Sequence, residues 1–308
     1  MTEVRPEPAA LAWDQESGGV EWHVELDRAV LLPGRLVGGR LALHATRDVA
    51  ARQLVAALVG EEHWRHRVTT HDANGTTSTR VVTTREELRR VPEILHGPLH
   101  LAAGERWEAA FDLPVPSMGP ATLDAEDAGL EWRFEAKLDI DDAFDSSTER
   151  PVVIAQPTAL LRAGAVHVGQ FALYESADVA ADGVTGSIEF EPMPLVTGES
   201  FDGRIRLQVG ERVKLQEIRA ELRVNVEATV SEGEKETITA WSSVIAPEAE
   251  YHGSIDLPIS GELGPRPLPT VDLPHGKAQA TFHVILARAW TTDTHLVRDV
   301  TIATTREV

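Results

Sequence analysis

Period-two alternation of apolar and polar residues narrows the folds open to this chain more than any other feature. In residues 20–26, Val20, Trp22, Val24 and Leu26 take every second position, with acidic residues and a histidine between them. The pattern recurs in residues 132–138, 218–226 and 280–286. Because successive side chains of a strand point to opposite faces, it predicts strands with one buried and one solvated face. Gly and Pro punctuate these runs at short intervals, which favours β-sandwiches over βαβ units.

Helix signals are few. Residues 84–91 fit one or two helical turns or a charged strand, and the pattern does not decide between them. Residues 157–165 begin with Pro157 and continue with good helix formers, which predicts a short helix. Asn74 and Gly75 predict the tip of a β-hairpin, since tight hairpin turns need residues that accept positive φ. The fold class predicted from these patterns is all-β.

The two halves of the chain share a series of segments in the same order. An apolar residue, a turn glycine, a second glycine and an arginine before a strand occur in residues 32–41 and again in 195–205. The other matched pairs are residues 111–114 with 255–258, 132–138 with 281–287, and 150–155 with 298–303. Pro114 and Pro258 are expected to end their strands, because proline cannot donate to a ladder. Similar separations within the pairs indicate two copies of one sandwich.

The repeat sets the predicted domain boundaries. Residues 1–19 are expected to form a flexible N-terminal tail, and residues 20–157 the first sandwich. Residues 158–186, which include a small, acidic, Gly-bearing run, are expected to form a connector. Residues 187–308 then form the second sandwich.

Charge and composition limit the partners. The 308 residues carry a formal net charge of −20, which disfavours nucleic acid and anionic lipid surfaces as partners. The chain has no cysteine, so disulfides and thiolate zinc sites are excluded, and a reducing, cytoplasmic location is expected. No signal peptide is visible, and no apolar run is long enough to predict an integral membrane segment.

The first half resembles the N-terminal domain of arrestin-like proteins. The resemblance rests on Leu32-Pro33-Gly34, on residues 36–39, on residues 101–114 and on the strand that ends at Asp139. Residues 138–145, followed by a short apolar strand and Pro157, resemble the bacterial sporulation-control members of this superfamily. Residues 190–203 are similar to the start of their second half, whereas residues 261–275 depart from it.

The resemblance implies two tandem arrestin-like, immunoglobulin-like β-sandwich domains. It implies a non-catalytic cytoplasmic adaptor, scaffold or regulator that acts through protein–protein contacts, in bacterial development or cell-shape control, and it leaves self-association open. Two alternatives are a self-assembling structural protein and a ligand- or carbohydrate-binding β-sandwich module. A cleft with stacked aromatic residues and convergent polar groups would favour the last of these.

No chemical motif stands out, so we predict no catalytic residues, no cofactor and no metal. Asp139, Asp141, Asp142 and Asp145 are the densest acidic group, yet the later positions of a calcium loop are missing. Whether residues 139–145 bind a cation stays open. His63 and His66 fall on opposite faces of the expected strand. Serine-nucleophile and phosphate-binding glycine patterns are absent from the sequence.

Aromatic residues and strand edges are the predicted contact surfaces. Trp22, Trp107 and Trp132 lie on alternating rows and are expected in the core. The predicted partner contacts are Trp13, in the expected tail, and Trp241 and Trp290, near strand ends. Exposed edge strands are a second route, since they accept a strand from another chain.

Overall fold

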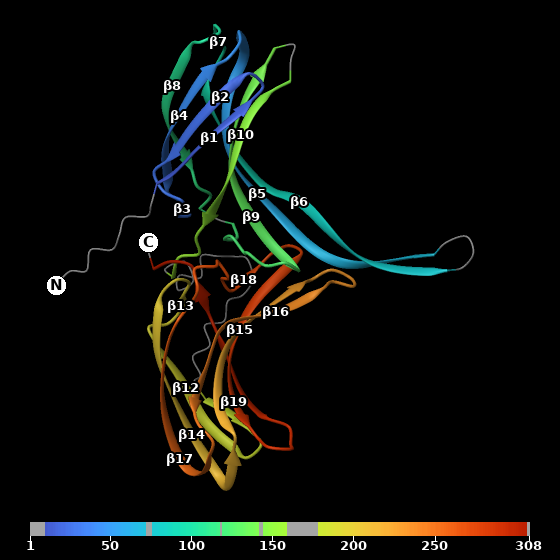
Figure 1. The fold of residues 1–308 in the computed structure, drawn as a ribbon, viewed down its shortest axis with the longest axis vertical. Coiled ribbons are helices and arrows are strands. Elements are labelled where there is room, and N and C mark those ends of the chain that lie inside the picture. The colour runs from blue at the N-terminus through green and yellow to red at the C-terminus, as the bar shows by residue number, and fades with distance from the viewer. Residues whose placement is uncertain (1–9, 72–75, 118, 142–143, 159–177, 307–308) are drawn as a thin grey trace, which may run out of the picture. The chain divides into compact units, whose positions relative to one another are not determined.

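The fold is described from a computed structural model, which describes residues 10–71, 76–117, 119–141, 144–158 and 178–306. The described part is all-β and consists of several sheets (Figure 1). Residues 84–91 lie within strand β6 (Thr77–His96), so the charged-strand alternative holds. The predicted hairpin tip at Asn74 and Gly75, and all but the first two residues of the predicted helix at 157–165, lie outside the described residues. No helix in the described ranges is long and apolar enough to span a bilayer.

The chain divides into two compact units, and two internal segments of the first half belong to unit 2. Unit 1 contains residues 1–62, 85–122 and 130–155, and unit 2 contains residues 63–84, 123–129 and 156–308. The expected first sandwich, 20–157, therefore gives up its last two residues and two internal segments to unit 2. One is the distal part of the hairpin of β5 (Val49–His71) and β6, whose residue Arg67 pairs with Glu234 in unit 2. A strand of this length passes beyond the core of its own sheet.

Unit 1 is built from two sheets. The first has the order β1 (Leu11–Ser17), β2 (Val20–Leu26), β4 (Leu36–Ala45), β8 (Arg106–Pro114). The second has the order β3 (Val30–Leu31), β10 (Ser146–Ile154), β9 (Ala128–Ile140), β5, β6, with β7 (Leu99–Leu101) paired to β5. β6 has a neighbouring strand on one side only, which makes it an edge strand.

The inner faces of these two sheets share one core. Trp22 and Trp132 are about 1% exposed, and Phe134 is completely buried. The ring of Phe134 stacks on Phe111 of the opposite sheet, with ring centroids 5.6 Å apart. Face-to-face packing of alternating strands, as in a β-sandwich, therefore explains the period-two pattern of the sequence.

Trp13 lies in this core and is not a tail residue. It belongs to β1, its side chain is 8% exposed, and its indole N–H donates to Thr148 Oγ1 at 2.8 Å. Its ring meets Phe134 edge-on, with centroids 5.5 Å apart. The expectation that residues 1–19 form a flexible tail is thus wrong for residues 11–17. β1 pairs with β2 along its whole length, and this pairing places Trp13 in the core despite the polar composition of β1.

Unit 2 repeats the arrangement. One sheet has the order β11 (Asp178–Ala181), β12 (Val184–Glu191), β14 (Ser200–Leu215), β17 (Ala249–Glu262). The other has the order β16 (Lys235–Ala246), β15 (Glu217–Ala228), β19 (Gly276–Ala287), β18 (Val271–Asp272), with β20 (Thr294–Val300) also paired to β19. β13 (Leu195–Val196) pairs in parallel with β21 (Ile302–Ala303). Phe190, Phe201 and Phe282 pack edge-on in its core.

The hydrogen-bond registers align the two units residue by residue. Ile154 pairs in parallel with Leu31 in unit 1, and Ile302 pairs in parallel with Leu195 in unit 2. Gly34 and Gly198 have φ values of 75° and 73°, and their N–H groups donate to Val115 O and Leu263 O at 3.1 Å. Both turns need the left-handed backbone that glycine adopts without strain.

This alignment corrects two of the sequence matches. Phe134 lies opposite Arg150 and Phe282 lies opposite Arg298, so residues 132–138 correspond to 280–286, one position from the predicted match. Pro114 pairs with Leu36 near the start of β4, whereas Pro258 pairs with Arg204 inside β14. The segment 111–114 therefore corresponds to 259–262. Pro258 does not end β17, because on an edge strand its missing N–H can face away from the ladder.

His283 of β19 makes the stability of unit 2 depend on pH. Burial, with the positive charge of Arg223 adding to it, lowers the pKa of His283 from 6.5 to about 4. Between pH 6.5 and pH 4, His283 is therefore protonated in the unfolded chain but neutral in the folded chain. The free energy of unfolding falls as the pH falls through that window. We expect this to account for about 1–2 kcal/mol, allowing for solvent screening. Urea unfolding of wild type and His283→Gln at pH 7 and pH 4.5 checks it, since the variant should lose that much less on acidification. Equal losses in both proteins would contradict the assignment.

Candidate functional site

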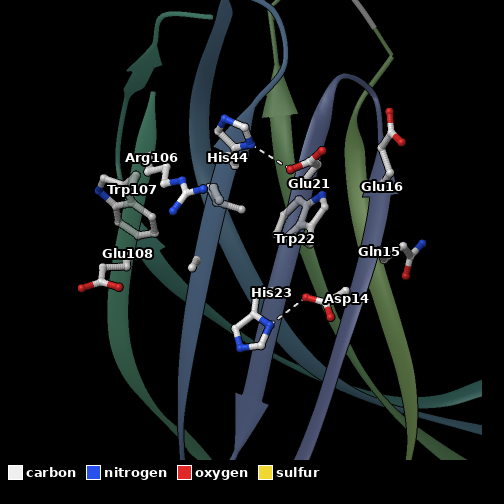
Figure 2. Close-up of a pocket in the computed structure, with 12 residues that line it drawn as sticks. Asp14, Gln15, Glu16, Glu21, Trp22, His23, His44, Arg106, Trp107 and Glu108 are labelled. Carbon is white, nitrogen blue, oxygen red and sulfur yellow. Dashed lines mark hydrogen bonds and ion pairs between the residues drawn. The ribbon is translucent and has the colours of Figure 1, made fainter. Parts of the chain in front are cut away.

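The outer face of the sheet β1-β2-β4-β8 in unit 1 carries the candidate site. A cavity of about 840 Å³ lies on this face and is lined by residues of all four strands (Figure 2). The polar members of the alternating pattern point into it, while their neighbours fill the core behind. The alternation that builds the sandwich therefore also builds the site.

Strand register arranges the lining side chains in two rows across the sheet. In the first row, His23 lies between Asp14 of β1 and Ala42 of β4, and Ala42 in turn pairs with Glu108 of β8. The second row runs Glu16, Glu21, His44, Arg106. Directly opposed side chains on one face of a sheet lie close enough to interact. Four carboxylates therefore face one arginine and two histidines.

The two histidines are held by carboxylates. His23 Nδ1 lies 2.7 Å from Asp14 Oδ1, and His44 Nδ1 lies 2.7 Å from Glu21 Oε2 (Figure 2). His23 Nε2 lies 3.2 Å from Glu25 Oε1. The hydrogen bond with Asp14, and then that with Glu25, raises the pKa of His23 above its ordinary value. Protonation of His23 makes the face less acidic, so the negative potential is strongest above that pKa.

Two tryptophans support the sheet beneath this face. The indole N–H of Trp22 donates to Ser146 Oγ at 2.8 Å, which ties β2 to the opposite sheet. Trp107 of β8 is half-buried, and its ring meets His96 edge-on with centroids 5.5 Å apart. The acidic side chains therefore stand on a rigid sheet.

The equivalent face of unit 2 is different. The register alignment sets Asp14, His23, Ala42 and Glu108 against Asp178, Ser187, Arg206 and Asp256. It sets Glu16, Glu21, His44 and Arg106 against Ala180, Thr185, Gln208 and Ser254. A cavity of about 560 Å³ is present there too. Its two rows hold two carboxylates, one arginine and no histidine, so the His–carboxylate chemistry is specific to unit 1.

The predicted contact residues are in different environments. Trp13 is a core residue, as described above. Trp241 of β16 is half-buried, and its ring meets Phe201 edge-on and stacks on Phe282, at centroid distances of 5.3 and 6.1 Å. Trp290 is fully exposed in the loop between β19 and β20. Of the three, Trp290 alone is fully exposed, whereas Trp13 and Trp241 pack against aromatic residues of their own units.

Two basic side chains of unit 1 pair with the three described aspartates of the acidic stretch at 139–145. Arg52 pairs with Asp139 and lies 3.5 Å from Asp141, and Lys137 Nζ lies 2.5 Å from Asp145. Asp142 lies outside the described residues. Among the residues the structure describes, no group of three or more histidines, aspartates or glutamates is placed to hold a metal ion.

No residue of the His–carboxylate face is among the contacts predicted from the sequence. The sequence pattern places three of its members on the polar side of one strand, namely Glu21, His23 and Glu25. The side chains beside them on the face come from three other segments of the chain, which the pattern does not connect. Comparison of the chain with known protein families, and with characterised proteins, found no match.

Proposed function

We propose that this chain is a non-catalytic, cytoplasmic adaptor of the arrestin-like kind, built from two tandem β-sandwich domains. On this proposal it binds a protein partner through the outer face of the sheet β1-β2-β4-β8. The same strand order in both units and the residue-level register between them support the tandem arrangement. The resemblance of the first half to arrestin-like domains supports the adaptor class.

The main support for this proposal is the difference in composition between the outer face of β1-β2-β4-β8 and the equivalent face of unit 2. The unit 2 face has ordinary polar residues, whereas the unit 1 face has four carboxylates and two histidines around a cavity. A function specific to the unit 1 face is the simplest physical account of this difference. Such a face attracts cationic groups, and electrostatic complementarity raises the association rate and the specificity of a protein complex. The expected partner is a protein with an exposed segment rich in Lys and Arg.

Charge neutralisation on the two faces tests the proposal. We expect Glu21→Gln with Glu108→Gln to weaken partner binding about tenfold at moderate salt, because two attractive charges are lost. The matched control is Asp178→Asn with Asp256→Asn on the unit 2 face. Partners captured from extracts of the source organism are identified by mass spectrometry, and their affinities are then measured with purified proteins. Equal weakening by both pairs, or by neither, would contradict the proposal.

A further inference from the structure

Trp290 lies at a position where its side chain makes no contribution to the hydrophobic core. Its side chain is 101% exposed, and its backbone has a φ of 65°, in the left-handed region that favours glycine. A tryptophan there exposes a large apolar surface and strains the backbone at the same time. Strain of this kind in an ordered loop points to a contact made with another molecule.

The loop that carries Trp290 is fixed at its base. The backbone N–H of Arg288 donates to Asp293 Oδ1 at 3.0 Å and closes the loop. The next residue, Thr294, is completely buried and donates its hydroxyl to Asp182 Oδ2 at 3.0 Å, in the turn between β11 and β12. Trp290 therefore projects from an anchored loop and loses little conformational freedom on binding.

The equivalent loop of unit 1 has the same closure. The N–H of Ile140 donates to Asp145 Oδ1 at 3.1 Å, and the buried Ser146 donates to Ser17 O at 2.6 Å, beside the turn between β1 and β2. This loop also exposes an aromatic residue, Phe144, which is 95% exposed. The two units thus carry equivalent loops, each closed by an aspartate and each exposing an aromatic side chain.

In unit 1 a cavity lies beside the exposed aromatic residue of this loop. The cavity measures about 750 Å³ and is lined by Gly18, Arg47, Arg52, Ile140, Phe144 and two aspartates. Arg47 donates to Gly18 O, and among the described residues no carboxylate lies within 4 Å of its guanidinium. Apolar atoms beside an arginine without an acidic partner suit an aromatic ring, which stacks on both.

We propose that Trp290 of one copy enters the cavity beside Phe144 of a second copy, so that the protein associates head to tail. The indole would contact Phe144 and the guanidinium of Arg47. Asp182 and Asp293 at the base of the Trp290 loop would then complement the arginines of the cavity. The two surfaces differ, so the contact is heterologous, and it builds open chains or closed rings instead of twofold dimers. This inference stands on other residues than the proposed function and does not depend on it.

Complementation between two defective variants tests this arrangement in the full-length protein. Trp290→Gly removes the inserted ring, and Arg47→Glu with Phe144→Ser disables the cavity. We expect sedimentation velocity to show concentration-dependent oligomers for wild type, and each variant alone to weaken association about tenfold or more. An equimolar mixture of the variants retains one competent contact and should form heterodimers that grow no further.

Thermal unfolding separates this role from a structural one. Because glycine accepts a φ of 65°, Trp290→Gly should melt at the same temperature as wild type or higher when both are compared at a concentration where wild type is monomeric. A wild type that stays monomeric at high concentration, a mixture that forms no heterodimer, or Trp290→Gly oligomers equal to those of wild type would each overturn the proposal. A lower melting temperature for Trp290→Gly at a concentration where wild type is monomeric would also overturn it, since the tryptophan would then be serving the fold.

Discussion

Replacing Trp132 with alanine is expected to lower the free energy of unfolding by about 3–5 kcal/mol, which is typical of a fully buried tryptophan. Trp132 lies on β9, between β10 and β5, and is 1% exposed. A Cβ atom on Gly60 would lie 2.9 Å from its ring, so the ring packs directly on bare backbone. Its indole N–H donates to Pro120 O at 3.3 Å. Truncation therefore opens a cavity and leaves a buried carbonyl without its donor.

Equilibrium urea unfolding, followed by circular dichroism, measures this effect. The control is Trp132→Phe, which keeps an aromatic ring and loses mainly the hydrogen bond, at a cost of about 1–2 kcal/mol. A Trp132→Ala protein within 1 kcal/mol of wild type, on the scale of ordinary surface substitutions, would show that the core of unit 1 is not packed as described.

Gly186→Ala should destabilise unit 2 by about 3 kcal/mol, because the added methyl group has no space. Gly186 pairs with Leu207 at the contact between β12 and β14. A Cβ atom there would overlap the carbonyl oxygen of Arg206 and lie 3.1 Å from Leu207 Cα. Both neighbours are backbone atoms, so the clash is relieved only by parting the two strands.

Gly264→Ala is the matched control, because a Cβ atom on Gly264 would meet nothing within 4 Å and its φ is not in the left-handed region. We expect it to change the free energy of unfolding by less than about 0.5 kcal/mol. Thermal and urea unfolding of the two variants separate the close approach of strands from a general effect of replacing glycine. Similar stabilities for Gly186→Ala and Gly264→Ala would contradict the register of β12 and β14.

Much of the fold was predictable because a strand buried on one face has apolar residues at every second position of its sequence. Residues 20–26 and 132–138 lie in strands with alternating burial, and residues 280–284 alternate in the same way before β19 becomes buried on both faces. β1 was not predicted because, in its sequence LAWDQES, the apolar positions Leu11 and Trp13 are followed on the same side by the polar residues Gln15 and Ser17. Its place in the sheet is set by pairing with β2, a long-range contact that local composition does not report.

The matched motifs show a second limit. Residues 111–114 and 255–258 look alike, yet strand pairing shifts their correspondence by four positions. Similar strings at the ends of strands arise easily, because apolar residues followed by proline suit any edge strand. The hydrogen-bond register aligns the two units, and the residues at equivalent positions distinguish the outer face of unit 1 from that of unit 2.

The candidate site was beyond prediction for a related reason. Its rows combine residues from β1, β2, β4 and β8, which are separated in the sequence by turns and by the long β5–β6 hairpin. In an acidic chain, Glu21 or Glu108 alone does not differ from many other carboxylates. Their cross-strand neighbours distinguish them from the other carboxylates. Glu21 pairs with His44, and Glu108 lies in the same row of the sheet as His23.

Site-specific photocrosslinking tests most directly whether the unit 1 face is the docking surface. A photoreactive amino acid replaces Ala42, which lies in the cavity between His23 and Glu108, and in a second protein replaces Arg206, the equivalent position in unit 2. We predict that position 42 crosslinks in cells to a Lys- and Arg-rich segment of one protein, and that position 206 does not. Crosslinks to the same partner from both positions, or from position 206 alone, would contradict the account.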